Sequence, residues 1–391
     1  MADIVGLLGT RTRVIPVTRV RFDVLDSWRG ICALLVTLFH FPAVGLLASN
    51  GFIRGSYLFV DFFFVLSGFV IAHAYGERLS DGTSLRRFLV TRFGRLFPLH
   101  LFMLLAFVAF ELVRLIVPSL SAGGGAFTGG TSLSSLWSNL FLVHGLGIAD
   151  SLSWNAPSWS ISTELFAYLL FGLVTLALNR TALLAFASAV IVAPMFLYAV
   201  SSDYMDATFD FGFIRCLYGF SFGVLIHAAF VRYAEMPAPD GETKLAWTFA
   251  EGATVAAVVL FVTTSHASAM SLAAPLIFGF AVFIFAHEAG YLSRVLGVRM
   301  FLMLGALSYS IYMTHLFVQG RMVTVAKLAE KLLGMSFLTE RGDGSIAFMA
   351  QSAFPAAIVM IALVVTASML TYRFIEVPGR EWFRQLAKKI R

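Results

Sequence analysis

The sequence predicts an all-α polytopic membrane protein with about ten transmembrane helices and both termini in the cytoplasm. Two properties of the composition support this fold class: 59% of the 391 residues are hydrophobic and only 13% are charged. Soluble domains carry about 25% charged residues, so this chain has too few polar side chains to cover its surface in water. The third observation is that its apolar residues gather in long stretches, which indicates that lipid forms part of its solvent.

Ten windows are long and apolar enough to cross the hydrocarbon layer as helices, since one span needs about 20 mostly apolar residues. The windows are 30–49, 57–76, 97–117, 159–178, 181–200, 211–231, 245–264, 268–288, 301–319 and 350–375. A shorter stretch, from Leu133 to Ile148, contains Trp137, Asn139 and His144. It is too short and too polar to cross, and we interpret it as a membrane-surface or re-entrant segment.

The distribution of charge predicts the orientation of this bundle. The net charge is +6 and the isoelectric point is about 9.4, but most basic residues lie in loops beside apolar windows. The positive-inside rule explains them without a nucleic-acid partner. We therefore expect a multi-pass protein of a bacterial cytoplasmic membrane. It would have a cytoplasmic N-terminal segment, 1–28, a transmembrane domain, 29–378, and a basic cytoplasmic tail, 379–391.

The last outer loop, about 320–349, departs from the positive-inside rule because it is basic. It contains Arg321, Lys327, Lys331 and Arg341. One interpretation is an amphipathic surface helix over 321–334, whose lysines extend toward water. The other interpretation is a basic surface for an anionic acceptor.

The first span carries an arginine and a histidine on one face. Arg29 and His40 are eleven residues apart, which returns to nearly the same side of a helix and separates them by about 16 Å along its axis. An ionisable side chain at membrane depth is costly and is a functional hypothesis by default. His40 would lie near the middle of the bilayer, where Pro42 loosens the helix. The structural alternative is a neutral core histidine bonded to a neighbouring helix.

Three further ionisable residues are predicted at one depth, slightly outside His40. Asp61 lies in the second span, Glu164 in the fourth and His315 in the ninth. Four such groups on four helices predict a polar cavity that opens to the outer face. Two of them also have a structural interpretation, an inter-helix hydrogen bond for Asp61 and a capping role at a helix N-terminus for Glu164.

A basic cluster marks the cytoplasmic mouth of the bundle. It contains Arg86, Arg87, Arg92 and Arg95. Arg92 and Arg95 are three residues apart and share one helix face, and guanidinium groups match phosphate oxygens bidentately. We expect a phosphate site at this pair, whereas the first two arginines are expected to anchor the loop.

Taken together, these motifs resemble the acyltransferase-3 family of integral membrane O-acyltransferases. That family includes O-antigen and Nod-factor acetylases, glucan succinyltransferases and macrolide acyltransferases. The resemblance covers nearly the whole chain, from Leu25 to Pro378, and rests on the order and spacing of five motifs. They are Arg29 with His40, the run Ser67 to Ile71, Arg92 with Arg95, Ser160 with Glu164, and the Ser-Tyr-x-x-Tyr-x-x-His run from Ser308 to His315.

The resemblance implies an enzyme that moves an acyl group, most commonly acetyl, from cytoplasmic acyl-coenzyme A to a hydroxyl group. The acceptor would be a saccharide or glycolipid of the cell envelope, or an exported saccharide, and no metal is implied. His40 would be the general base, and Glu164 or Asp61 would orient its ring as in a catalytic triad. A covalent acyl-histidine route fits the same residues.

Six residues are expected to hold the two substrates. They are Arg29, Arg92 and Arg95 for the phosphates of the coenzyme, and Ser160, Tyr309 and His315 for the substrate at the reacting end. Two other functions fit the same charged groups. One is a proton-coupled transporter or flippase, since carriers also use buried acidic residues and histidines. The other is an acyl shuttle that passes the group to a partner enzyme.

Overall fold

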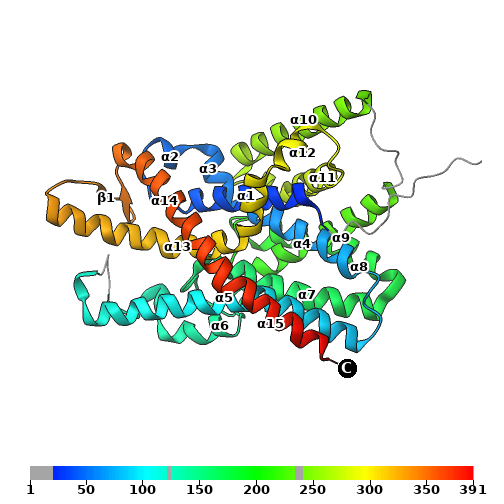
Figure 1. Ribbon diagram of the computed structural model, residues 1–391, viewed down its shortest axis with the longest axis horizontal. Helices are drawn as coiled ribbons and strands as arrows, with labels where there is room; N and C mark the ends of the chain where they lie inside the picture. Colours follow the sequence, from blue (N-terminus) through cyan, green and yellow to red (C-terminus); the bar gives the residue numbers. More distant parts are fainter. Residues whose placement is uncertain (1–20, 121–124, 234–240, 391) are drawn as a thin grey trace, which may run out of the picture.

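The computed structural model describes residues 21–120, 125–233 and 241–390, and its architecture is all-α, as predicted (Figure 1). The first 20 residues of the expected N-terminal segment lie outside the described residues. The main elements are α1 (Asp23–Phe39), α2 (Leu46–Ser49), α3 (Gly51–Gly55), α4 (Phe59–Tyr75), α5 (Gly82–Ile116), α6 (Leu136–Leu140), α7 (Trp159–Leu178), α8 (Ala182–Val200), α9 (Gly212–Tyr233), α10 (Gly241–Ser265), α11 (Ala274–Ala286), α12 (Tyr291–Leu296), α13 (Arg299–Leu333), β1 (Leu338–Glu340), β2 (Ile346–Phe348), α14 (Ala350–Thr371) and α15 (Val377–Lys388).

The polytopic fold is confirmed by the length and apolar character of these helices. Nine helical segments of the described residues are long and apolar enough to cross a membrane, and α1, with 17 residues, is the tenth helix of the bundle. Each predicted window overlaps one of them. The stretch from Leu133 to Ile148 holds the five-residue helix α6 between turns, which is too short for a span.

The first helix is displaced from its predicted window. α1 begins at Asp23, with two acidic residues in its first turn that suit the positive end of the helix dipole. Pro42 does not fit inside a helix, and Gly45 turns the chain with a φ of 81°, which glycine adopts without strain. The prediction of a mid-helix position in a span of 30–49 is therefore wrong, because His40 caps the C-terminus of α1.

Two helices are much longer than their windows. α5 and α13 each have 35 residues. At 1.5 Å per residue each measures about 52 Å, more than the roughly 30 Å of a hydrocarbon layer. The separate surface helix predicted over 321–334 is wrong, because α13 continues through these residues and is capped by Gly334 in the left-handed conformation.

A short hairpin joins the loop that follows α1. β1 and β2 pair antiparallel. The amide of Phe348 donates to the carbonyl of Pro42 at 2.8 Å, and the amide of Val44 donates to the carbonyl of Phe348 at 3.0 Å. These bonds fix the loop directly after His40. We call this side of the bundle, at the left of Figure 1, the hairpin end.

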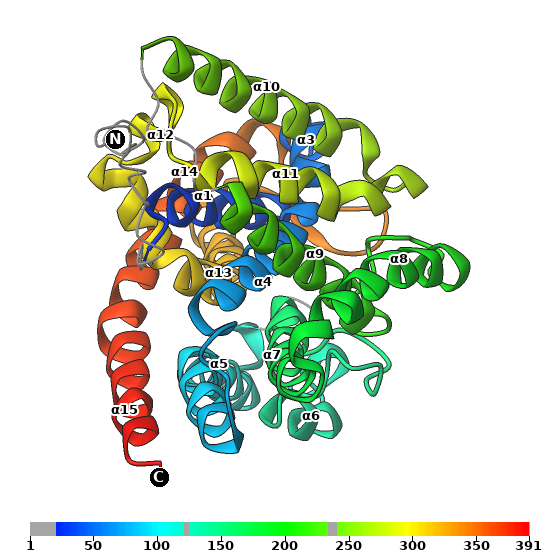
Figure 2. The same ribbon diagram turned by 90° about the vertical axis from the view of Figure 1, so that its right-hand side faces the viewer.

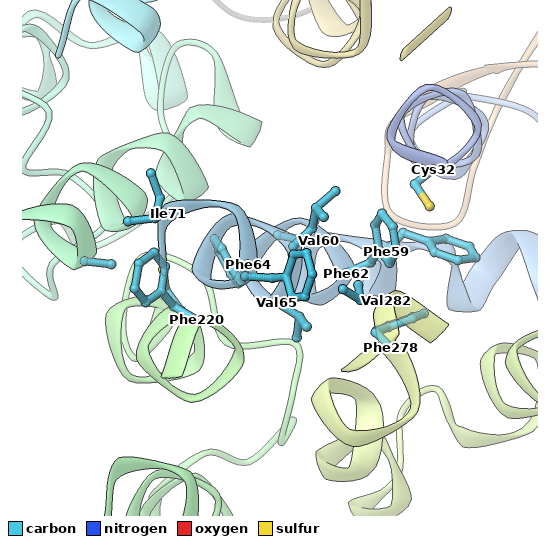
Figure 3. Close-up of a cluster of buried hydrophobic side chains, with 14 of the residues drawn as sticks. Cys32, Phe59, Val60, Phe62, Phe64, Val65, Ile71, Phe220, Phe278 and Val282 are labelled. Carbon is cyan, nitrogen blue, oxygen red and sulfur yellow. The ribbon is translucent and has the colours of Figure 1, made fainter. Parts of the chain in front are cut away.

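α4 lies inside the bundle and is packed by aromatic side chains. Figure 2 places it between α1, α9 and α5. Figure 3 shows Phe59, Phe62 and Phe64 of α4 with Phe220 of α9 and Phe278 of α11. The ring centroids of Phe59 and Phe278 are 5.5 Å apart, and those of Phe62 and Phe278 are 6.0 Å apart. This apolar packing fixes the helix that forms one wall of the site described below.

α1 and α13 touch through glycines. A Cβ atom on Gly30 would lie 2.5 Å from the backbone of α13, and one on Gly305 would lie 2.3 Å from the carbonyl oxygen of Asp26. Only glycine lets two helix backbones approach so closely. His40 and His315 each lie ten residues after one of these glycines, so two parallel helices with equal rise bring the histidines together.

Candidate active site

A cavity of about 890 Å³ lies between α1, α4, α5, α7, α13 and α15. Its wall includes the exposed residues Arg87, Arg384 and Lys388, so it opens where α5 begins and α15 ends. We call this side of the bundle the basic end. Eight basic and two acidic residues line the cavity. They are Arg21, Arg29, Arg87, Arg92, Arg95, Arg380, Arg384 and Lys388, with Asp26 and Glu164.

The three arginines predicted to bind phosphate all line this cavity. Arg29 is paired with an aspartate one turn before it, 3.1 Å away. Arg92 donates from Nη2 to the hydroxyl of Tyr75 at 3.0 Å. Arg95 lies 3.8 Å from the carboxylate of Glu376, which is too far for a hydrogen bond. Its guanidinium therefore keeps donors for an anion that enters the cavity.

α7 contributes a polar stripe to the cavity wall. Ser160, Glu164 and Tyr168 all line the cavity and, at a spacing of four residues, lie above one another over about 12 Å. Ser67 Oγ and the Tyr168 hydroxyl both donate to Oε1 of Glu164, at 2.6 and 2.5 Å. Both hydroxyl groups thus converge on one oxygen of the Glu164 carboxylate. The stripe therefore places a carboxylate at its middle position.

Tyr312 and Phe63 form the end of the cavity nearest the hairpin end. Their rings pack edge to face, with centroids 5.9 Å apart. The Tyr312 hydroxyl lies 2.9 Å from Ser160 Oγ and donates to the carbonyl of Pro157 at 3.1 Å. On its other side the Tyr312 ring centroid is 5.9 Å from that of His315. The Tyr312 ring therefore lines the cavity and also contacts His315, which does not line it.

His40 and His315 form a pair just beyond this end. Nδ1 of His40 lies 3.3 Å from Nε2 of His315 and 2.9 Å from the carbonyl oxygen of Val36. Nδ1 of His315 lies 2.7 Å from the carbonyl oxygen of Tyr312. Since a carbonyl oxygen only accepts hydrogen bonds, both Nδ1 atoms carry a proton. Nε2 of His315 then accepts from His40.

In the neutral imidazole of His40 this arrangement leaves Nε2 without a proton. No hydrogen bond to that atom is present among the residues that the structure describes. A free lone pair on an imidazole can take the proton of a hydroxyl group. The resulting cation would keep its Nδ1 proton on the Val36 carbonyl and on His315, which together stand where a catalytic triad has its carboxylate.

Neither predicted carboxylate reaches His40. Glu164 is held by the two hydroxyl groups of the stripe. Asp61 forms a fully buried ion pair with Arg215, with Nε to Oδ1 at 2.9 Å and Nη2 to Oδ2 at 2.8 Å. The prediction that one of them orients the His40 ring is corrected, because depth along a helix does not fix the side that a residue faces.

Arg215 is the main partner that the sequence reasoning missed. Its guanidinium also lies near the rings of Tyr57 and Trp159, with distances of 5.7 and 5.4 Å to the centroids. The signal for it is a single arginine inside the apolar window 211–231. An arginine at that depth requires a buried anion, which identifies Asp61 as a structural partner.

The residues predicted to hold the substrate divide between two places. Ser160 and Tyr309 line the cavity, and the Tyr309 hydroxyl donates to the carbonyl of Leu96 at 2.5 Å. His315 instead pairs with His40 at the other side of Tyr312. The polar groups therefore form a path from the basic end to the histidine pair, with Tyr312 at the boundary.

The chain is similar to several known proteins. A family model described as an acyltransferase domain matches residues 22–373. The chain is 37% identical over 163 residues to protein 2 in the picA locus of Rhizobium radiobacter, covering 37% of this chain and 78% of that protein. It is 34% identical over 118 residues to the acyltransferase MdmB of Streptomyces mycarofaciens, covering 29% of this chain and 27% of that protein. No solved structure matches the chain significantly.

Proposed function

This chain belongs to the acyltransferase domain family, and we propose that it transfers an acetyl group from cytoplasmic acetyl-coenzyme A to a hydroxyl group of an envelope or exported saccharide. The observation that carries this proposal is a basic cavity that ends beside a histidine pair with a free lone pair. The cavity suits an anionic donor. From the positive-inside rule we expect the basic end in the cytoplasm, so the acceptor would approach His40 from the hairpin end.

The wall of the cavity supports coenzyme A as the carrier of the acyl group. Coenzyme A carries a diphosphate bridge, and guanidinium groups bind phosphate oxygens bidentately. Arg92 and Arg95 lie on one face of α5 and line the cavity. The stripe from Tyr168 to Ser160 then offers a polar path of about 12 Å for the extended arm. The thioester would end beside Tyr312.

In the proposed reaction His40 acts as the general base. Its Nε2 takes the proton of the acceptor hydroxyl while the hydroxyl oxygen attacks the thioester carbonyl and forms a C–O bond. The C–S bond then breaks, and the coenzyme A thiolate takes the proton back from His40. The Tyr312 ring must shift to admit the thioester, because it lies between the cavity and His315.

The carboxylate of Glu164 in the α7 stripe favours a donor with a neutral acyl group. Glu164 lies one helical turn from Ser160, the residue that contacts Tyr312. The hydrogen bonds to Glu164 come from two hydroxyl groups, and no basic side chain among the described residues donates to it. A succinyl group would bring a second carboxylate near this charge, and like charges placed together are unfavourable. Acetyl adds no charge.

We expect the purified protein to release free thiol from acetyl-coenzyme A when a saccharide acceptor is present. Succinyl-coenzyme A should react at least about tenfold more slowly because of the like charges. Glu164→Gln keeps the shape of the side chain and an acceptor oxygen but removes the charge. It should therefore lower the ratio of the acetyl-coenzyme A rate to the succinyl-coenzyme A rate. The exposed variant Glu340→Gln serves as the control.

Thiol release with each donor decides between the possible outcomes. Absence of release from either donor would contradict the transferase assignment and favour a carrier of envelope precursors. Equal use of the two donors by the wild-type protein would contradict the neutral acyl group while leaving the transferase assignment in place. If Glu164→Gln left the ratio of the two donor rates unchanged, the charge of Glu164 would not explain the preference for acetyl-coenzyme A.

A further inference from the structure

α15 adds three basic residues to the cavity wall from outside the bundle of long apolar helices. Figures 1 and 2 show it beside α5. Arg380, Arg384 and Lys388 are four residues apart, so they form one stripe on a single helix face, and all three line the cavity. Arg384 and Lys388 are exposed, whereas Arg380 is half-buried. This α15 stripe therefore extends from the mouth of the cavity inward.

Close contacts hold α15 in this position. A Cβ atom on Gly94 of α5 would lie 2.0 Å from Cβ of Phe383, so only glycine permits the two helices to pack this closely. At the far end of α15, Arg87 donates from Nε and Nη2 to the carbonyl oxygen of Ile390, at 3.1 and 2.8 Å. The basic face of α15 is thus fixed against α5 at both ends of their contact.

One buried carboxylate lies between the arginines of α5 and the basic residues of α15. Glu376 lies at the junction of α14 and α15, and its Oε2 accepts from Ser310 at 2.9 Å. Its Oε1 has no hydrogen-bond partner among the described residues and lies 3.8 Å from Arg95 and 3.9 Å from Arg380. Since one oxygen atom lies near both arginines, the α5 and α15 cations form a continuous basic surface.

We propose that the α15 stripe is a second phosphate site, which binds the 3′-phosphate of coenzyme A while Arg92 and Arg95 bind its diphosphate. This inference rests on the proposed function. The 3′-phosphate is a monoester, and phosphomonoesters carry about −1.5 to −2 charges at neutral pH. It sits on the ribose, at the end of the molecule farthest from the thioester. It therefore falls at the outermost cations, Arg384 and Lys388.

Anionic lipid headgroups present the same phosphate chemistry. α15 also exposes Trp382 and Leu386, which is typical of a helix at a membrane interface. The stripe, however, faces the cavity, whereas Lys389, the next basic residue of the chain, does not line it. A ligand inside the cavity is therefore the source that the geometry favours.

The test compares the binding of coenzyme A and 3′-dephospho-coenzyme A to the purified full chain in nanodiscs of zwitterionic lipid. The wild-type protein should bind coenzyme A about tenfold more tightly, because a charge-assisted phosphate contact is lost with the 3′-phosphate. The double variant Arg384→Ala/Lys388→Ala should bind both ligands with nearly equal Kd. Lys389→Ala is the matched control and should keep the wild-type ratio, since it removes a cation from the same helix.

Each outcome of this test has one meaning. A double variant that keeps the wild-type affinity ratio would overturn the inference. If anionic lipid in the nanodisc lowered the affinity of the wild-type protein for coenzyme A but not that of the double variant, α15 would be a lipid-binding helix instead. If the double variant bound coenzyme A and 3′-dephospho-coenzyme A more weakly by the same factor, the inference would also be overturned. The α15 stripe would then act on the diphosphate, which both ligands share. A wild-type protein that bound neither ligand would contradict the proposed function itself, and with it this inference.

Discussion

Replacing His40 by alanine should lower the rate of acetyl transfer by about 1,000-fold, within the range of general-base catalysis. The Nε2 atom of His40 supplies the unprotonated lone pair of the site, since both carbonyl contacts fall on Nδ1 atoms. His40 does not line the donor cavity, so the affinity for coenzyme A should change little. The initial rate of transfer from labelled acetyl-coenzyme A to the glycan fraction, together with the Kd of coenzyme A, measures both effects.

A second histidine serves as the control for this variant. His287 is half-buried and stacks on Trp247, with ring centroids 4.7 Å apart, and it does not line the cavity. His287→Ala should therefore keep most of the transfer rate. Transfer at the wild-type rate by His40→Ala would remove His40 from the mechanism, whereas an equal loss in both variants would point to damaged packing.

Replacing Asp61 by asparagine should lower the free energy of unfolding by about 3–5 kcal/mol, the cost of breaking a buried ion pair. Arg215 is 1% exposed and would remain charged without a full counter-ion. Its guanidinium also donates to the carbonyls of Tyr57 and Ala207. Thermal unfolding in detergent, followed by intrinsic fluorescence, should show this loss as a clear drop in Tm.

The double variant Asp61→Leu/Arg215→Met separates a structural role from a catalytic one. Replacing both charges by apolar side chains of similar size is often neutral for stability, so this variant should recover most of the Tm and the transfer rate. A stable but inactive double variant would show that Asp61 takes part in the chemistry. The exposed variant Asp343→Asn is the control, and surface changes of this kind stay within about 0.5 kcal/mol.

The number of helices could be predicted from the sequence because hydropathy reports directly on burial in lipid. Their ends could not, since these depend on local backbone geometry. Pro42 and Gly45 stop α1 well before the end of its apolar window. α13 continues beyond its window to Gly334 because many of the residues that follow, among them Ala326 and Lys331, are good helix formers.

Which arginines lie together could be predicted from the sequence, but the partners of the acidic residues could not. The three arginines do share one cavity, whereas His40 caps the C-terminus of α1 instead of lying inside the helix. The partners of Asp61 and Glu164 depend on how neighbouring helices are rotated, which a single sequence does not reveal. For the same reason the sequence does not reveal that α15, which continues α14 through the turn 372–376, packs against α5 and places its cations at the cavity.

Transfer across a sealed membrane tests the central claim most directly. The protein would be reconstituted in proteoliposomes, with labelled acetyl-coenzyme A on the side of the basic end and a glycan acceptor on the side of the hairpin end. We predict that label appears on the glycan with the wild-type protein and is lost with His40→Ala. Two results would contradict the claim that a donor in the basic-end cavity meets its acceptor at His40. One is transfer only when donor and acceptor are on the same side of the membrane, and the other is transfer that persists in His40→Ala.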